Sequence, residues 1–449
     1  MRSLIGKAIK LKKRVARLLE KTKRLLMREY GIKESILNFC EKIEGEVSDS
    51  FYKIDEVKEY NQLKVLNSMQ EISLGERHFT YSTGYGYDDI GREAIEKVYA
   101  RVFNTEEALV RPHIISGTHA LSLCLSGILR PGDEILSVTG KPYDTLEDVI
   151  GISDIEKGQG SLRDFGITYK QVDLLEDGEV NIKKVMETIS EKTKLIFIQR
   201  STGYEWRKAV TINRIKNVVK QIKPKFPNIV FMVDNCYGEF IEGMEPTDVG
   251  VDVIAGSLIK NPGGGLAPTG GYIVGRKDLI DIIANRLASP GLGKEAGATL
   301  GINRLFFQGL FLAPHIVAEA LKVAVFGAKT FQRLGFEVCP QPDDERSDII
   351  QGIKLGNAEN IITFCNAIQG ASPVDSYVSP EPWEMPGYND PIIMAAGAFV
   401  QGSSIELSAD APIKEPYAAY LQGGLTYEHG KIGLYLALQR LADKNTIRF

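Results

Sequence analysis

The chain has few of the residues that bind metals or form covalent crosslinks, with five cysteines and five histidines in 449 residues. The cysteines are scattered and odd in number, and they contain no Cys-x-x-Cys pair, so we expect neither a disulfide framework nor a zinc site. The histidines show no ligand spacing, and we predict no metal site. Reduced thiols are typical of a cytoplasmic protein, which is the expected location.

Long hydrophobic runs are also absent, because no apolar stretch approaches the roughly 20 residues of a membrane-spanning helix. A hydrophobic content of 43% and a charged content of 25% are ordinary for a globular protein. The length is sufficient for two or three domains around a large core. We therefore expect a soluble enzyme with a small-molecule substrate, no nucleic-acid partner and no firm membrane association.

The charge is distributed unevenly. Residues 1–28 contain eleven Lys or Arg and one Glu, which is a charge of +10. Because the net charge of the whole chain is −4, the remaining residues carry a charge of −14. Apolar residues recur there at helical spacing and predict a basic amphipathic helix. Such a helix could lie on an acidic membrane surface or act as a targeting presequence. An N-terminal extension that packs on a neighbour or stays partly disordered is the simpler interpretation.

The hydrophobic periodicity predicts an α/β architecture. Residues 29–77 form a helical arm, with two helices between Glu29 and Leu66, and residues 78–326 alternate helices with short apolar strands. The expected strands are Ala108–Ile115, Glu134–Val138, Ile167–Val172, Leu195–Gln199, Val230–Asp234, Val253–Ala255 and Gly271–Val274. This alternation predicts a mostly parallel, doubly wound sheet. A long helix, Pro314 to Leu334, leads to a smaller α+β unit at residues 327–449, with strands at Ile349–Lys354 and Ser404–Leu407.

Two of these strands end on residues with complementary chemistry. Asp234 closes the strand that begins at Val230, and Lys260 follows the next strand by a few residues. Parallel strands end at the same edge of a sheet, where open α/β proteins bind ligands. A lysine that forms a Schiff base and an aspartate that pairs with a pyridinium nitrogen are what a pyridoxal phosphate site requires. Taken singly, each could be a surface lysine in a glycine loop or an aspartate that caps a helix.

Further residues support the cofactor prediction. Ser116, Gly117 and Thr118 form a turn between a strand and an apolar helix, where backbone N–H groups and the helix dipole favour an anion. Tyr143 offers an aromatic ring that can stack on a flat cofactor. Ser257 precedes Lys260 by three residues and can reach the same phosphate. Ser201, at the end of another strand, is an additional cofactor candidate, whereas Cys236 is expected to be a buried structural cysteine.

The order and spacing of these residues resemble those of fold-type-I pyridoxal phosphate enzymes. More narrowly, the chain resembles the cystathionine and methionine gamma-lyase group, above all its aluminium resistance branch of carbon–sulfur lyases. The motifs that carry this resemblance are Thr83 to Arg92, Gly140 to Glu147 and Gly402 to Asp410. The resemblance covers roughly Ile54 to the C-terminus. It implies a homodimer or homotetramer in which the active site is shared between subunits.

The resemblance also assigns substrate-binding roles. It places a tyrosine about 30 residues before the phosphate turn into the neighbouring subunit's site, which points to Tyr85, with Tyr81 and Tyr87 as competitors. The family's arginine two residues after that tyrosine is Tyr87 here, and Arg92 could replace it. The family's C-terminal arginine, which binds the substrate carboxylate, has no counterpart, and Arg346 is the substitute that we consider.

The implied activity is a β- or γ-elimination on a sulfur-containing amino acid, which gives a thiol, a 2-oxo acid and ammonia. Lys260 would move the proton from Cα, and we expect its desolvated, electropositive surroundings to lower its pKa. Another reaction on the same cofactor, such as aminotransfer or aldol cleavage, remains an alternative. A non-catalytic adaptor that retains the fold is a third hypothesis, against which the pair of Lys260 and Asp234 argues.

Overall fold

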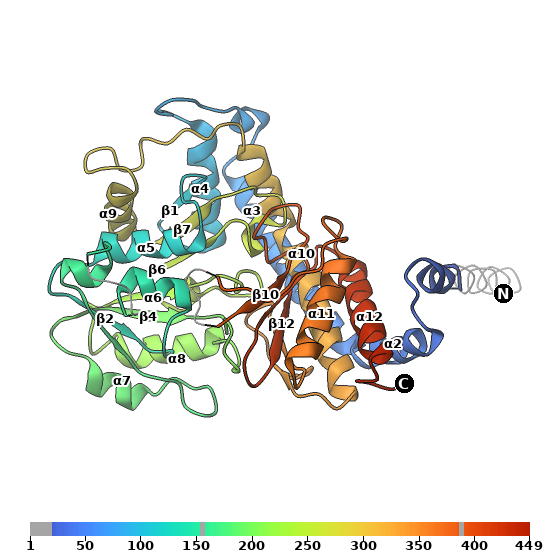
Figure 1. Ribbon diagram of the computed structural model, residues 1–449. Coiled ribbons are helices and arrows are strands. Elements are labelled where there is room, and N and C mark those ends of the chain that lie inside the picture. The colour runs from blue at the N-terminus through green and yellow to red at the C-terminus, as the bar shows by residue number, and fades with distance from the viewer. Residues whose placement is uncertain (1–19, 153–157, 386–389) are drawn as a thin grey trace, which may run out of the picture.

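The computed structural model describes residues 20–152, 158–385 and 390–449, which form a large and a small α/β unit joined by a long helix (Figure 1). The large unit contains a seven-stranded sheet in the order β1-β7-β6-β5-β4-β2-β3. Its strands are β1 (Glu107–Arg111), β2 (Glu134–Ser137), β3 (Thr168–Gln171), β4 (Thr193–Gln199), β5 (Val230–Asp234), β6 (Val253–Ser257) and β7 (Gly271–Gly275). Only β7 runs antiparallel to its neighbours, β1 and β6. The sheet is therefore mostly parallel, as predicted.

Helices cover both faces of this sheet. Alternate residues of each strand point to opposite faces, so that in β5 the side chains of Phe231 and Val233 join one core and those of Val230 and Met232 join the other. The helices α5 (Gly117–Ile128), α6 (Asp144–Ile150) and α9 (Lys277–Leu287) cover one face. On the opposite face lie α4 (Ile90–Val102), α7 (Ile182–Thr188) and α8 (Ile212–Ile222) (Figure 1). Because helices cover both faces of the sheet, the central strands are apolar on both sides.

The smaller unit is built on an antiparallel sheet in the order β10-β11-β12-β9-β8. Its strands are β8 (Val338–Cys339), β9 (Gln351–Lys354), β10 (Ile392–Ala395), β11 (Ser408–Pro412) and β12 (Ala418–Gln422). The helices α11 (Ala358–Ala371) and α12 (Tyr427–Asp443) pack on this sheet (Figure 1). The predicted α+β unit is thus present.

The helix α10 (Asn303–Arg333) connects the two units and contributes side chains to both cores. The predicted boundary at residue 326 lies inside this helix. Of the residues that the structure describes, only α10 is long and apolar enough to cross a membrane, and 67% of its apolar stretch is buried, as in a core helix. The arm helices α2 (Glu34–Glu46) and α3 (Ser48–Glu71) pack against α10, and residues 20–29 are helical. Residues 1–19 of the predicted basic helix lie outside the described residues.

Three sequence predictions differ from the structure. The first strand ends at Arg111 and does not continue to Ile115. The long helix begins eleven residues before Pro314, which lies inside it, although proline is commonest at the first helical position. The predicted strand Ser404–Leu407 is wrong, because β11 begins only at Ser408. The segment before β11 is held instead by the carboxylate of Glu406, which accepts hydrogen bonds from two backbone N–H groups.

Candidate active site

The catalytic candidates meet where the central strands end. Asp234 is the last residue of β5, and in the sheet it is paired with Gln199 of β4 and Ala255 of β6. Ser257 is the last residue of β6, and Lys260 follows it after one tight turn. Because these strands are parallel, their carboxyl ends share one edge of the sheet, as predicted. The carboxylate and the ammonium group are therefore brought to one place by topology.

A cavity of about 570 Å³ opens at this edge, between the large and the small unit. Seven of the predicted cofactor residues line it together with Lys260. They are Ser116, Gly117, Thr118, Tyr143, Ser201, Asp234 and Ser257. The structure thus brings together residues that are up to 144 positions apart in the sequence, from Ser116 to Lys260. The small unit supplies the remaining wall with residues of β10, β11 and β12.

The turn at Ser116 leads directly into α5. The Ser116 hydroxyl caps the helix by accepting a hydrogen bond of 3.0 Å from the backbone N–H of His119. A Cβ atom added at Gly117 would lie 3.1 Å from the Cys236 sulfur and 3.5 Å from Cβ of Ser257, so this backbone passes close to the neighbouring strand ends. The N-terminus of a 12-residue helix therefore faces the cavity with small residues, an arrangement that suits a phosphate.

Lys260 is half-buried at the cavity wall, and polar and aromatic groups surround it. Its Nζ lies 4.0 Å from the centre of the Tyr237 ring, which is a cation–π distance. Burial by itself lowers the pKa of Lys260, but Cys236, Tyr237 and the Asp234 carboxylate outweigh burial and raise the pKa above its ordinary value. The lower pKa that the sequence predicts applies to a pocket that holds a phosphate, and it remains a prediction.

Asp234 is buried and Tyr143 is half-buried in the same cavity. Burial raises the pKa of Asp234, and this effect is opposed by the positive charge of Lys260 and by the backbone N–H of Cys236, which donates to Oδ1 at 3.0 Å. The Tyr143 hydroxyl lies 2.9 Å from the Thr118 hydroxyl, and its backbone N–H donates to Gln199. Burial raises the pKa of Tyr143 as well. Hydrogen bonds within the chain thus hold both side chains in position.

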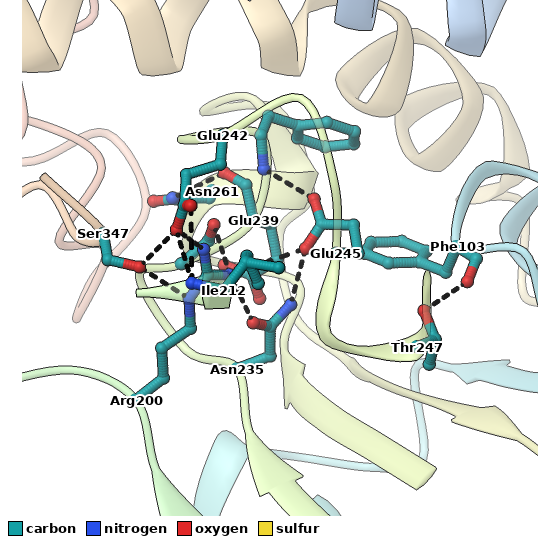
Figure 2. A network of polar contacts seen from close by, with 12 residues as sticks. Phe103, Arg200, Ile212, Asn235, Glu239, Glu242, Glu245, Thr247, Asn261 and Ser347 are labelled. Atoms are coloured by element: carbon teal, nitrogen blue, oxygen red, sulfur yellow. Dashed lines mark hydrogen bonds and ion pairs between the residues drawn. The ribbon is translucent and has the colours of Figure 1, made fainter. Parts of the chain in front are cut away.

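A network of polar contacts lies next to the ends of β4 and β5 (Figure 2). Its centre is Arg200, which is completely buried and follows β4 directly. The guanidinium donates to Asn235 at 2.7 Å and to Ser347 at 3.0 Å, and it forms an ion pair of 2.9 Å with Glu242. Asn235 in turn donates to Glu245 (Figure 2). Because Asn235 is the neighbour of Asp234, this network helps to hold the end of β5 in place.

The glycines after Lys260 allow a close contact with α10. A Cβ atom added at Gly264, where φ is +54°, would lie 2.3 Å from the Gly309 carbonyl oxygen. A Cβ atom added at Gly309 would lie 2.2 Å from the Gly263 carbonyl oxygen. Only residues without side chains permit this approach. The lysine loop is therefore clamped against the long helix, which explains the Gly263 to Gly265 run without a nucleotide.

Three predicted or considered residues do not reach the cavity within this chain. Arg346 donates to Gln351 at 2.6 Å, and its Nε and Nη1 atoms are buried without a hydrogen-bond partner among the described residues. Arg92 is also buried, and it donates to the backbone carbonyls of Gly297 and Glu295, so its role is structural. Tyr85 is 72% exposed and stacks on Tyr87. Its placement in a neighbouring subunit remains a prediction.

The small unit and the loop after β4 contribute further residues to the cavity that were not predicted from the sequence. The Tyr204 hydroxyl donates to Asp410 Oδ2 at 3.3 Å, and the Tyr204 ring lies 5.5 Å from that of Tyr420. Gln422 donates to the same Asp410 oxygen at 2.8 Å. All four line the cavity. Asp410 ends one of the motifs named from the sequence, but no local pattern indicates that it is hydrogen-bonded to a residue 206 positions away.

Comparisons with known proteins cover nearly the whole chain. The family model of methionine gamma-lyase matches residues 36–442. The uncharacterized protein YnbB of Bacillus subtilis is 51% identical over 90% of this chain and 96% of its own length. A solved structure, a carbon–sulfur lyase involved in aluminum resistance from Clostridium novyi NT, is 55% identical and covers 94% of this chain and 99% of its own, with a TM-score of 0.90.

A more distant solved structure, from Campylobacter jejuni, shares the fold at 17% identity, with a TM-score of 0.54 over 80% of this chain and 88% of its own. That structure contains N'-pyridoxyl-lysine-5'-monophosphate. Together the matches confirm the fold class and the family resemblance that the sequence motifs predicted, and with them the prediction of a lyase enzyme.

Proposed function

The chain belongs to the methionine gamma-lyase family, and we propose that it is a pyridoxal phosphate-dependent lyase that cleaves a carbon–sulfur bond of an amino acid. The observation that carries this proposal is the meeting of Lys260, Asp234 and the N-terminus of α5 in one cavity. An amine, a carboxylate and a phosphate-binding turn match the three polar ends of that cofactor. The donor set thus fits the group, and no metal is required.

Each residue has a distinct task in this proposal. Lys260 would hold the cofactor covalently through Nζ, and Asp234 would pair with its ring nitrogen. Ser116, Gly117, Thr118 and Ser257 would bind the phosphate, Tyr143 would stack on the ring, and Ser201 would be a further polar contact. When bound, pyridoxal phosphate supplies a sink for the electrons left at the substrate Cα.

Lys260 would then carry the proton. In its neutral form Nζ would take the proton from Cα, and the neighbours that favour the protonated form would help Lys260 to hold that proton until it is delivered to the leaving thiolate. The carbon–sulfur bond breaks, the sulfur leaves as a thiol, and water converts the remaining fragment to a 2-oxo acid and ammonia.

The subunit arrangement is part of the same proposal. Tyr81, Tyr85 and Leu300 are 68%, 72% and 64% exposed, and they lie on two segments joined by backbone hydrogen bonds between residues 82 and 300 and between 85 and 297. A rigid, apolar surface of this kind is typical of a subunit contact. We therefore assign it to a second copy of the chain, with Tyr85 completing the partner's site in a homodimer or homotetramer. A cytoplasmic location also remains a prediction.

The test begins with the purified protein and pyridoxal phosphate. The wild type and an exposed-lysine control, Lys192→Ala, should acquire a visible absorption band, and Lys260→Ala should not. Thiol release from a panel of sulfur amino acids, without an added 2-oxo acid acceptor, then identifies elimination. A wild-type protein that stays colourless, or product formation that needs an amino acceptor, contradicts the proposal, the latter in favour of aminotransfer.

A further inference from the structure

The cavity wall formed by β11 and β12 carries a carboxylate, that of Asp410, whose two oxygens differ in their hydrogen bonds. Asp410 of β11 lies opposite Tyr420 in the sheet register, beside Gln422 of β12. The Gln422 amide at 2.8 Å and the Tyr204 hydroxyl at 3.3 Å both donate to the same oxygen, Oδ2. Two hydrogen bonds to one oxygen fix the carboxylate in a single orientation. The other oxygen, Oδ1, accepts no hydrogen bond from any side chain that the structure describes.

No cation neutralises this carboxylate within the described part of the chain. Lys141 and Lys414, which also line the cavity, are paired with Glu147 at 2.7 Å and with Asp390 at 2.5 Å. Burial raises the pKa of Asp410 to about 6, and the hydrogen bonds from Tyr204 and Gln422 and the positive charge of Lys260 only partly oppose this effect. Asp410 is half-buried, and even a partly desolvated carboxylate without a paired charge is costly. A ligand that brings a positive charge to Asp410 would recover that cost.

The charge of the cavity lining as a whole also favours a positively charged ligand. Among its described residues are six acidic side chains and three lysines, and no arginine. The acidic residues are Asp144, Glu147, Glu205, Asp234, Asp390 and Asp410. An amino-acid substrate has two charged groups at Cα, of which the amino group is engaged at Lys260 in the proposed reaction. The α-carboxylate would be repelled by Asp410, so a cation that the substrate presents to this wall would lie on its side chain.

We propose that Asp410 is a specificity-determining residue that selects sulfur amino acids whose leaving thiol carries an ammonium group. This inference rests on the function proposed above and names its substrate class. An ammonium group on the sulfur side would donate to Asp410 Oδ1, while Tyr204 and Gln422 keep Oδ2 in place. The ring of Tyr420, held 5.5 Å from that of Tyr204, would form an apolar flank for the methylene groups of the side chain.

Three cysteine thioethers of similar size test this inference on the holoenzyme. They are S-(2-aminoethyl)-L-cysteine, S-propyl-L-cysteine and S-carboxymethyl-L-cysteine, which end in a cation, a methyl group and an anion. We expect kcat/KM for the cation to exceed that for the neutral thioether at least about tenfold, as for a desolvated charge pair. Asp410→Asn should abolish this preference while kcat/KM for the propyl compound changes by less than about threefold.

A matched control is Glu205→Gln, because Glu205 also lines the cavity but is already paired with Arg207 at 2.5 Å. This variant should keep the preference for the cation. Equal kcat/KM for the cationic and neutral thioethers in the wild type overturns the inference and leaves the elimination reaction intact. A parallel loss on all three compounds in Asp410→Asn also overturns it, since the residue would then be structural.

A binding measurement separates the inference from the proposed function. The affinities of the Lys260→Ala protein for the cationic and neutral thioethers are compared by calorimetry, which needs no turnover. If no thioether is cleaved by the wild type, β-elimination from these compounds fails. A tenfold tighter binding of the cation, lost on adding Asp410→Asn, then still supports Asp410. Equal affinities, or no binding of either compound, overturn its role.

Discussion

Glu239 makes stability depend on pH, because this carboxyl is buried next to the catalytic strand ends (Figure 2). The Tyr272 hydroxyl donates to Oε1 at 2.7 Å, and Oε2 is buried without a hydrogen-bond partner among the described residues. Burial raises the pKa of Glu239 to about 8 from the 4.5 of an exposed glutamate. The folded protein therefore keeps a proton on Glu239 at pH 7 that the unfolded chain has lost.

The sign of the pH effect follows from this difference in bound protons. The stabilising contribution of the neutral carboxyl is fully present below pH 4.5 and is lost as the pH rises toward 8, because the folded state binds more protons throughout that range. Between pH 5 and pH 8 the free energy of unfolding should fall by roughly 3–4 kcal/mol on account of this residue. Glu239→Gln has nearly the same shape, and it cannot titrate.

We therefore expect Glu239→Gln to match the wild type at pH 5 and to be more stable at pH 8. The assay is the unfolding midpoint in urea or on heating, measured for both proteins across this pH range in the same buffer series. The exposed control Glu187→Gln on α7 should follow the wild type at every pH. A constant difference between Glu239→Gln and the wild type from pH 5 to pH 8 refutes the reasoning, because the carboxyl would then not titrate there.

Two further predictions concern the proposed reaction. Asp234→Asn cannot keep a proton on the cofactor ring nitrogen, so kcat/KM should fall several hundredfold, about 3–4 kcal/mol in the barrier, with the absorption band retained; near-full activity would leave Asp234 a structural role only. A mixture of inactive Tyr85→Phe and Lys260→Ala proteins should recover up to about a quarter of the normal sites on subunit exchange, because one site of each mixed dimer is intact. A fully active monomer in light scattering contradicts the shared site.

The part of the site that lies at the ends of the parallel strands was predictable from the sequence. Asp234, Ser257 and Lys260 lie within two consecutive strands and the loop that follows, so local patterns fixed both their strands and the edge at which they meet. The turn at Gly117 was predictable for the same reason, since a strand, small residues and a helix follow one another directly. In a doubly wound sheet the order of strands matters little for this purpose, because every parallel strand ends on one edge.

The rest of the site depends on contacts that no local pattern encodes. Asp410 faces the cavity only because β11 and β12 pair in the observed register, and the predicted strand in that region was placed four residues too early. A strand shifted by an odd number of residues exchanges its faces, and one shifted by an even number exchanges its partners. Arg346 was considered for the carboxylate because it is an arginine near the start of the small unit. The structure shows its guanidinium directed toward Gln351 instead.

The buried arginines explain why charged residues were hard to assign from the sequence. Arg200, Arg92 and Arg111 are among the largest fully buried side chains, and all three hold loops or strand ends by several hydrogen bonds to backbone or carboxylate oxygens. A guanidinium has five donors in a rigid plane, which makes it well suited to fix several chain segments at once. In this protein the arginines therefore support the site from outside. The residues that line the cavity are left with an excess of carboxylates, and the proposed positive charge on the substrate rests on that excess.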